Sequence, residues 1–291
     1  MSDQLKIGFI GFGEAGFTLA MGLRSAGIEQ ICAYDIKSET LEPGKKIRQR
    51  AAESHTRLLD SPADVAQASN LILSTVTADA ATSAATQIVE SLEPHHLYVD
   101  LNSVSPAVKR RIAEIVTDHG SRFVEGAIMA AVKPHGHRVP ILLGGIHASA
   151  VLDLLGPHGM RLEVVSEQVG AAAAVKMCCS IVVKGLEALL FECALAARRY
   201  DADERVFASL NESLPGQDWT KLAGYMMSRV LEHGERRARE MEEVAETLRA
   251  AGIEPIMAQA TARRQELGAQ LNDFAGNVPE DYRDVVQALT G

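Results

Sequence analysis

The sequence contains few cysteines, and they form no recognisable redox or zinc motif. Four occur among 291 residues, and none belongs to a CxxC pair. A small secreted scaffold held together by disulfides is therefore excluded as a class. We expect the thiols to pack as small apolar side chains in a reducing compartment. They are Cys32, Cys178, Cys179 and Cys193.

Long apolar runs and an excess of positive charge are also missing. No apolar stretch is long or uninterrupted enough to cross a bilayer, and the first residues lack the basic and apolar regions of an export signal. The formal net charge is −9, which repels nucleic-acid phosphates and anionic lipid. Hydrophobic residues make up 47% of the chain and charged residues 23%, a globular balance. We therefore expect a soluble, cytoplasmic protein with neither nucleic acid nor membrane as a partner.

Short β-rich runs alternate with helical runs through the first half of the chain. Such alternation predicts an α/β fold, a doubly wound parallel sheet of the Rossmann type with helices on both faces. The expected strands cover residues 5–10, 31–35, 56–59, 70–76, 97–101, 122–129, 139–143 and 161–166. The clearest helices between them are expected over residues 14–26, 78–92, 105–119 and 147–155.

The second half of the chain has a different composition. Residues 170–199 lack proline and carry a continuous background of alanine, leucine and valine, which predicts a helix buried nearly all round. Further helical stretches extend through Trp219 and over residues 232–250 and 255–271. We therefore predict a Rossmann domain over residues 1–166, followed by an all-α substrate and dimerisation domain over residues 167–291.

A glycine-rich turn follows the first expected strand. The pattern Gly11-x-Gly13-x-x-Gly16 joins that strand to the first expected helix. The first glycine permits the tight turn, the second lets a pyrophosphate approach the backbone, and the third lets helix and strand pack closely. Unpaired N–H groups and the positive dipole end of the helix favour an anion there, so a dinucleotide site is predicted. Its residues in this turn are Gly11, Phe12, Gly13, Glu14, Ala15 and Gly16.

An acidic residue ends the second expected strand. Asp35 lies at the distance from the glycines where a carboxylate accepts hydrogen bonds from the adenosine ribose hydroxyls. A 2′-phosphate at that place would meet like charge, which favours NAD over NADP. Lys37 and Ser38 follow, and they could hold a phosphate instead. NAD is thus the expected cofactor, with NADP as the alternative.

A lysine interrupts the apolar helix predicted over residues 170–199. Lys176 would be costly to bury as an ammonium, which indicates a paired or functional group. Desolvation disfavours its charged form and eases proton exchange near neutral pH. Ser180 lies four residues later on the same face, where it could orient the lysine or a substrate. The alternative is that Lys176 reaches along the helix to the surface and carries no chemistry.

Four segments resemble the β-hydroxyacid dehydrogenase family, which includes 6-phosphogluconate and 3-hydroxyisobutyrate dehydrogenases. Besides the glycine turn, residues 99–106 are similar to the family's D-x-S-T-x-x-P motif. Residues 125–131 stand in the place of its D-x-P-V-S-G-G substrate motif. Gly170…Lys176…Ser180 is similar to its G-x-x-x-K-x-x-x-N motif. Residues 233–241 are similar to a sub-branch with a phosphogluconate-dehydrogenase-like C-terminal domain.

The resemblance implies hydride transfer between a nicotinamide and the carbinol carbon of a small hydroxy acid or sugar acid. Lys176 would be the general base in oxidation and the general acid in reduction. A second subunit would help the helical domain to close over the cofactor, so a homodimer is expected. The resemblance adds cofactor-binding residues at Thr75, Val76, Thr77 and Asn102. The implied substrate-binding residues are Ser103, Met129, Ala130, Ala131 and Ser180.

Two departures from the family concern the substrate. Residues 129–131 read Met-Ala-Ala where the family has Ser-Gly-Gly to hold a carboxylate, and Ser180 stands where it has asparagine. No metal is expected, because the pair His135-x-His137 has no carboxylate or third histidine at ligand spacing. Donors that could replace the lost anchor follow at Lys133, His135, His137 and Arg138.

Two other functions stay open on the sequence. One is an imine reductase of similar architecture, although such enzymes generally lack the lysine. The other is a dinucleotide-binding redox sensor without catalysis, which the altered residues 129–131 would permit.

Overall fold

The structure is a computed structural model that describes residues 5–272, 274 and 277–290. The chain divides into two compact units, Met1–Lys176 and Met177–Gly291. The boundary predicted at residues 166 and 167 falls between β8 (Leu162–Ser166) and α8 (Ala171–Arg199). The division between the units falls inside α8, so this helix belongs to both.

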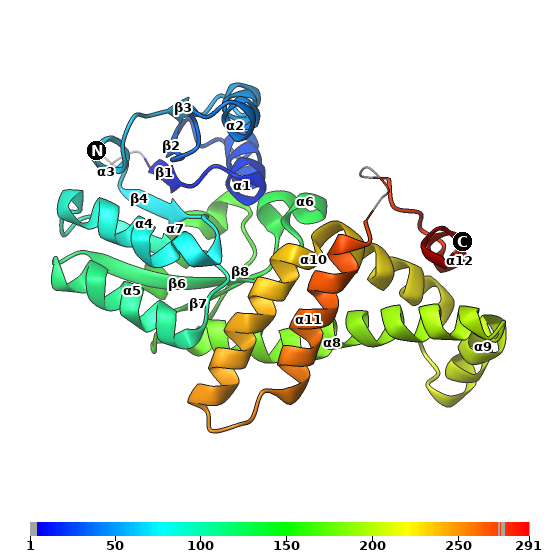
Figure 1. The fold of residues 1–291 in the computed structure, drawn as a ribbon. Coiled ribbons are helices and arrows are strands. Elements are labelled where there is room, and N and C mark those ends of the chain that lie inside the picture. Colours follow the sequence, from blue (N-terminus) through cyan, green and yellow to red (C-terminus); the bar gives the residue numbers. More distant parts are fainter. Residues whose placement is uncertain (1–4, 273, 275–276, 291) are drawn as a thin grey trace. The chain divides into compact units, whose positions relative to one another are not determined.

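In the described part of the first unit, eight strands form one sheet in the order β3-β2-β1-β4-β5-β6-β7-β8 (Figure 1). The chain starts at β1 and reverses direction across the sheet at β4, as doubly wound dinucleotide-binding folds do. The predicted fold class is confirmed. The strands not yet given are β1 (Lys6–Ile10), β2 (Gln30–Tyr34), β3 (Arg57–Leu58), β4 (Leu71–Ser74), β5 (Leu97–Asp100), β6 (Arg122–Ile128) and β7 (Ile141–Gly144).

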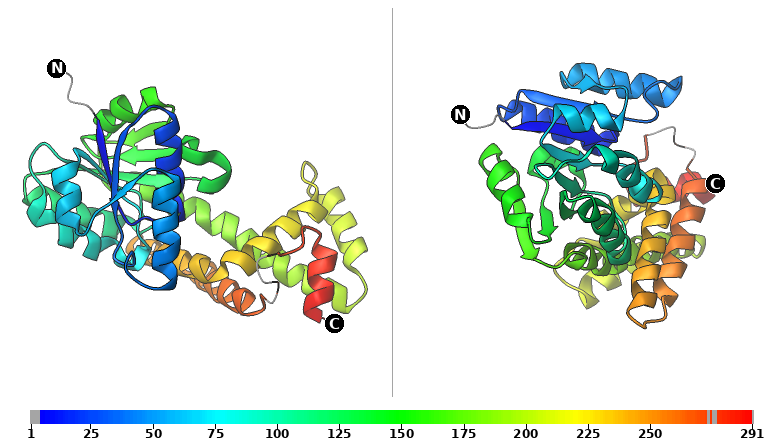
Figure 2. Two further views of the ribbon diagram at one scale, coloured as in Figure 1. Left: turned by 90° about the horizontal axis from the view of Figure 1, so that it is seen from above. Right: turned by 90° about the vertical axis from the view of Figure 1, so that its left-hand side faces the viewer.

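Helices cover both faces of this sheet (Figure 2). Alternate residues of one strand therefore enter different hydrophobic clusters: Leu71 and Leu73 of β4 pack into one, and Ile72 packs into the other. This is why the strand sequences are apolar without alternation. The helices are α1 (Glu14–Ser25), α2 (Glu42–Glu53), α3 (Pro62–Ala68), α4 (Ala81–Ile88), α5 (Pro106–Asp118), α6 (Val132–His135) and α7 (Ala148–Leu155). Short 3₁₀ turns cover Ala78–Ala80, Val89–Ser91, Gly136–Arg138 and Gly156–His158.

The sheet departs from the predicted all-parallel arrangement at one pair. Strand β7 runs antiparallel to β6, with Glu125 opposite Gly144 and Ile128 opposite Ile141. A parallel return would need a full crossover, whereas the helix between these strands, α6, has only 4 residues. The Met129 N–H continues the ladder by donating to the Pro140 carbonyl at 2.9 Å. The prediction of a parallel sheet is therefore wrong for β7 and for β8, which pairs parallel with β7.

The described part of the second unit is helical. Helices α10 and α11 run side by side (Figures 1 and 2). Its core includes Phe191, Met227 and Val230, and the Phe207 and Tyr282 ring centroids lie 4.6 Å apart. Besides the C-terminal part of α8, the unit contains α9 (Asp203–Ser213), α10 (Trp219–Ala250), α11 (Ile256–Gln270) and α12 (Tyr282–Thr290).

Helix α8 is not buried all round in the single chain. Phe191 and Ala194 are fully buried, but Val182 is 71% exposed and Leu189 57%. Cys178 and Cys179 are also exposed, so the prediction that they are packing residues is wrong for this chain alone. An alanine- and valine-rich helix is apolar on every side, and its sequence alone does not say which side a neighbour covers.

Candidate active site

Gly11 holds the backbone conformation that the turn after β1 requires. Its φ is +86°, and an added Cβ would lie 2.7 Å from Val76 Cγ1 and 2.9 Å from the Thr75 carbonyl oxygen. The Thr75 hydroxyl donates to the Gly11 carbonyl at 2.7 Å. The structure thus brings two of the predicted cofactor residues after β4, Thr75 and Val76, against the glycine turn. Thr77 follows them and is exposed.

The N-terminus of α1 has open space at Gly13 and close packing at Gly16. Gly13 is its N-cap, no side chain caps it, and a Cβ added there would meet nothing within 4 Å. A Cβ on Gly16 would instead lie 2.8 Å from both the Gly11 carbonyl oxygen and Thr75 Oγ1. Glu14 is exposed and Ala15 partly exposed in the same first turn. The first N–H groups of α1 therefore face space that an anion can occupy.

Asp35 fixes the loops on both sides of it. Its Oδ2 accepts from the Phe12 N–H at 2.7 Å, and its Oδ1 accepts from the Lys37 N–H at 2.9 Å. The Phe12 side chain is fully buried and packs edge-on against Phe9. Phe12 thus gives its N–H and its ring to the protein itself. The carboxylate keeps acceptor capacity, since two oxygens offer about four lone-pair sites.

Asn102 and Ser103 follow β5 and carry unsatisfied oxygens. Asn102 is 3% exposed, and its Nδ2 donates to Ser74 Oγ at 2.9 Å. Asn102 Oδ1 and Ser103 Oγ have no hydrogen-bond partner among the described residues. A buried polar atom left in this state costs about 1–3 kcal/mol, unless a water molecule or a ligand supplies the missing hydrogen bond.

A buried lysine, Lys109, fixes the segment after β5, and the sequence analysis did not identify it. Lys109 is 1% exposed, and its Nζ donates to Asp100 Oδ1 at 3.0 Å, to the Asp100 carbonyl at 2.7 Å and to the Gly126 carbonyl at 3.1 Å. Asp100 Oδ1 also accepts from the Asn102 N–H at 2.8 Å. The ion pair therefore ties the ends of β5 and β6 together and fixes Asn102. The sequence did carry a signal for it, because Lys109 lies on the same buried face of α5 as the apolar residues Ile112 and Val116.

A second missed residue, Glu125, sets the start of α8. Its side chain is fully buried, and Oε1 accepts from the Gly170 N–H at 2.7 Å and the Ala172 N–H at 2.9 Å. A negative charge at a helix N-terminus is stabilised by the helix dipole. Gly144 leaves the necessary room, because a Cβ there would lie 2.4 Å from Glu125 Oε1. The signal was a carboxylate inside a strand predicted to be buried.

The predicted catalytic lysine lies in the second turn of α8. Lys176 is partly exposed, as is Met129, whereas Ala130 and Ala131 are exposed in the loop before α6. Ser180 is 8% exposed, and its Oγ accepts from Lys184 Nζ at 3.0 Å. Glu125 therefore positions the helix that carries Lys176, one turn before the lysine.

One of the histidines after residue 131, His137, packs against the first helix. His137 Nε2 lies 3.1 Å from the His158 carbonyl, and the ring packs against Gly22 of α1. Burial lowers the pKa of His137. Across the residues that the structure describes, no group of three or more His, Cys, Asp or Glu is placed to hold a metal ion. Within the same residues, no helix combines the length and apolarity needed to cross a membrane.

Comparisons with known proteins match two separate parts of the chain to family models. The NAD binding domain of 6-phosphogluconate dehydrogenase matches residues 6–149, and a domain of unknown function (DUF1932) matches residues 197–267. A conserved hypothetical protein from Sinorhizobium meliloti 1021 is 37% identical with a TM-score of 0.76, over 99% of this chain and 96% of that one. A conserved protein of unknown function, reported as structurally similar to 3-hydroxyacid dehydrogenases, is 31% identical with a TM-score of 0.71, over 92% of this chain and 99% of that one.

More distant relatives include named enzymes. The mitochondrial 3-hydroxyisobutyrate dehydrogenase of Homo sapiens is 25% identical over 227 residues, which is 76% of this chain and 65% of the human protein. An imine reductase variant from Myxococcus stipitatus is 18% identical with a TM-score of 0.58, over 99% of both chains, and shares the fold alone. Together with the glycine turn and the sheet order, these matches show that the chain belongs to the β-hydroxyacid dehydrogenase family of oxidoreductases, whose cofactor is a nicotinamide dinucleotide.

Proposed function

We propose that the protein is an NAD(P)-dependent dehydrogenase that acts on the carbinol group of a small hydroxy acid or sugar acid. The observation that carries the proposal is the uncapped N-terminus of α1. A Cβ on Gly13 would meet nothing within 4 Å, and the Asp35 carboxylate stands across the same turn. Backbone N–H groups facing free space suit a diphosphate, and a carboxylate beside them suits a ribose.

The residues present fit a dinucleotide in three places. Gly11, Gly13 and Gly16, with Glu14 and Ala15 of the same turn, would receive the diphosphate. Thr75, Val76 and Thr77 would line the cofactor after β4. Asn102 Oδ1, which is buried without a partner among the described residues, would accept a hydrogen bond from the carboxamide or the substrate. The nicotinamide, when bound, supplies the acceptor or donor of a hydride from the carbinol carbon.

Lys176 would move the proton that accompanies this hydride. In oxidation its neutral amine takes the proton of the substrate hydroxyl, and in reduction its ammonium returns a proton to the carbonyl oxygen. Glu125 supports this role indirectly, because it fixes the first turn of α8 through two backbone N–H groups. Glu125 is therefore a positioning residue rather than a catalytic one.

The substrate would lie beside Ser103 and Ser180, with residues 129–131 lining it. The family's carboxylate anchor is absent there, since Met-Ala-Ala replaces Ser-Gly-Gly. Of the basic candidates after that segment, His137 is engaged with the His158 carbonyl. Lys133, His135 and Arg138 are exposed, and they are the remaining side-chain donors of this loop for a carboxylate or phosphate.

NAD is the cofactor that the loop after β2 favours. The Asp35 carboxylate is held in place by two backbone N–H groups, so it would face a 2′-phosphate with a fixed negative charge. Ser38 is nearly buried and its hydroxyl donates to Glu39 Oε1 at 3.5 Å, whereas Lys37 is exposed and Arg48 donates to the Ser38 carbonyl. We also propose that the protein is a homodimer. The apolar residues Val182 and Leu189 of α8 are exposed, and they offer a surface for a second subunit.

The experiment is a panel of hydroxy acids assayed with NAD and with NADP. It includes 3-hydroxyisobutyrate, L-serine and 6-phosphogluconate. We expect turnover of at least one member with NAD, and a loss of about 10²–10⁴-fold in kcat for Lys176→Met, the usual contribution of a general acid–base. Cofactor affinity of that variant, measured by calorimetry, is expected to stay unchanged. Turnover that survives in Lys176→Met would remove the lysine from the mechanism.

A further inference from the structure

Ser180 makes a hydrogen bond unlike those of most other hydroxyls on helices of this protein. A helical serine or threonine usually donates to the carbonyl four residues earlier. Thr18, Ser25, Thr86 and Thr117 do so, at 2.8, 3.0, 3.0 and 2.8 Å. Ser180 instead accepts, from Lys184 Nζ at 3.0 Å, and no acceptor for its own hydrogen is found among the described residues. Its hydroxyl is therefore held as an acceptor, with its hydrogen uncommitted.

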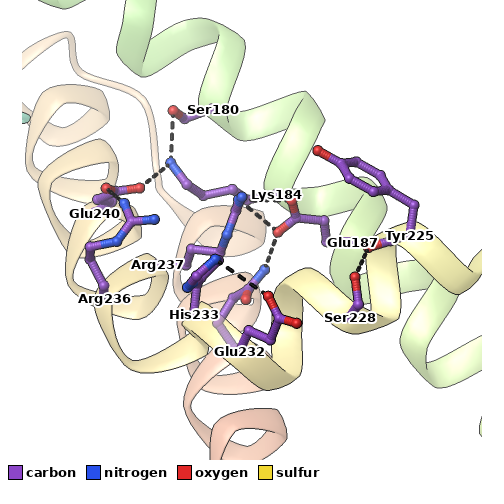
Figure 3. Close-up of polar contacts among 11 residues, drawn as sticks. Ser180, Lys184, Glu187, Tyr225, Ser228, Glu232, His233, Arg236, Arg237 and Glu240 are labelled. Atoms are coloured by element: carbon purple, nitrogen blue, oxygen red, sulfur yellow. Dashed lines mark hydrogen bonds and ion pairs between the residues drawn. The ribbon is translucent and has the colours of Figure 1, made fainter. Parts of the chain in front are cut away.

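Lys184 is held in place by a carboxylate. Its Nζ lies 2.9 Å from Glu240 Oε2, with side-chain exposures of 7% and 13% (Figure 3). Arg236 also pairs with Glu240 from the same helix, α10. An ammonium only donates, so Ser180 Oγ can only accept from it. The helical unit thus contains a chain of three side chains, Glu240, Lys184 and Ser180. Lys184 is the donor to both of the others.

The hydroxyl at the end of this chain lies on the same helix stripe as Lys176. Residues four apart on an α-helix are neighbours on one face, and helical side chains lean toward the N-terminus. Ser180 therefore leans toward the turn that carries Lys176. The family motif has an asparagine at this position, which carries its own amide donors. A serine has a single hydrogen that rotates freely unless a neighbour fixes it.

We propose that Lys184 is a positioning residue that makes Ser180 a hydrogen-bond donor to the substrate beside Lys176. By occupying the Ser180 oxygen, Lys184 directs the hydroxyl hydrogen outward, to a substrate hydroxyl or carboxylate oxygen. Glu240 keeps the ammonium in place. The pair Lys184 and Ser180 together would do what the amide of an asparagine does alone. This inference rests on the proposed function, since it needs a substrate at Lys176.

The neighbouring ion pair provides a matched control. Glu187 lies one turn further along α8, and its Oε1 lies 2.7 Å from Arg237 Nη1 (Figure 3). Gln265 Nε2 donates to Glu187 Oε2 at 2.8 Å. This pair is as buried as Lys184 and Glu240, but Ser180 is not among its hydrogen-bond or ion-pair partners in the described residues. A Glu187→Gln change therefore disturbs the buried polar core of this unit, including the charge attraction between Glu187 and Lys184, but leaves the partners of Lys184, which are Ser180 and Glu240, in place.

The experiment compares Lys184→Met, Ser180→Ala, the double variant Lys184→Met/Ser180→Asn and Glu187→Gln. The wild type is first assayed on the panel above, and the variants are then assayed with the hydroxy acid that it turns over. We expect Lys184→Met and Ser180→Ala each to lower kcat/KM by about 10- to 100-fold, with NADH affinity unchanged. The asparagine double variant is expected to recover most of the loss, whereas Glu187→Gln lowers the melting temperature but not kcat/KM.

Two results would overturn the inference, and they differ from failure of the proposed function. The first is a wild-type kcat/KM in Lys184→Met. The second is a fall in kcat/KM that persists in the asparagine double variant and equals the fall in Glu187→Gln, which is what a purely structural lysine would give. If the wild type turned over no member of the panel, the proposed function would fail, and this inference with it.

Discussion

The sheet unit and the helical unit each bury a lysine, but they use its three N–H groups differently. Lys109 is 1% exposed and donates to three oxygens of Asp100 and Gly126. Lys184 is 5% exposed and donates to Glu240 and to a hydroxyl. A saturated ammonium that binds carbonyls holds backbone in place. An ammonium that donates to a hydroxyl oxygen also directs that hydroxyl's hydrogen away from itself.

The two lysines are expected to differ most in how much they contribute to the free energy of unfolding. Replacing Lys109 with methionine leaves Asp100 as a buried, uncompensated charge, so we expect Lys109→Met to lower the free energy of unfolding by about 3–5 kcal/mol. Lys184→Met should cost clearly less, because Glu240 keeps its pairing with Arg236. Urea unfolding followed by circular dichroism measures both, with the exposed Lys45→Met as control. Equal losses in the two variants would show that the two lysines have the same role.

Cofactor binding separates the glycine turn from the rest of the sheet unit. Gly13 has an ordinary φ of −70° and open space around its Cβ position, so Gly13→Ala should fold with unchanged stability. Its methyl group would occupy part of the open space at the N-cap of α1. We expect NADH affinity to fall by about 10- to 100-fold, the cost of disturbing hydrogen bonds to a charged group.

The matched control for that change is Gly156→Ala. A Cβ there would make only an ordinary contact, 3.7 Å from Leu152 Cδ1, away from the glycine turn. Calorimetric titration with NADH should give wild-type affinity for the control. Unaltered affinity in Gly13→Ala would move the diphosphate away from this helix N-terminus.

Cofactor choice gives a smaller effect. In Asp35→Asn the amide oxygen can still accept from the Phe12 N–H, but the charge that would repel a 2′-phosphate is gone. We expect the ratio of NADP to NAD affinity to rise roughly tenfold. Asp60→Asn, at an exposed aspartate, serves as the charge-matched control. A ratio that stays constant would mean that Asp35 does not face the adenosine ribose.

Thiol reactivity gives the smallest effect and contrasts the two units again. Burial raises the pKa of Cys32 in β2 to about 11, with Arg57 opposing, whereas Cys178 and Cys179 on α8 are exposed. At pH 8 we expect a maleimide to label the α8 pair first and Cys32 only upon unfolding. Because the folded pKa lies above the unfolded one, Cys32 also favours unfolding increasingly as pH rises from 9 toward 11. Mass spectrometry of labelled peptides decides, and rapid Cys32 labelling in the folded protein would contradict the assignment.

Much of the fold could be predicted because its signals are local. The glycine turn, the apolar strands and the helix start at Ser105 each depend on a few neighbouring residues. The direction of β7 could not be predicted from the strand itself, since a strand sequence is the same in either direction. The missed signal was the connection, because the expected strands over residues 122–129 and 139–143 leave only residues 130–138 between them, fewer than the dozen or so that a parallel crossover needs.

The candidate site was predictable where the chemistry lies in a contiguous motif. The supporting residues were harder, because Lys109 and Glu125 act through partners 9 and 45 positions away. Each had a signal nonetheless: a charged residue at a position whose pattern demands an apolar one. Lys184 is a third example, since it interrupts the same apolar helix as Lys176 and finds its carboxylate on α10.

Deuterium transfer tests the central claim most directly. The protein is mixed with NAD and the panel of hydroxy acids carrying deuterium on the carbinol carbon, and the cofactor is analysed by mass spectrometry. Hydride transfer beside Lys176 predicts NADH that contains one deuterium with wild type and almost none with Lys176→Met. Bound cofactor that remains oxidised and unlabelled with every member of the panel would contradict a dehydrogenase.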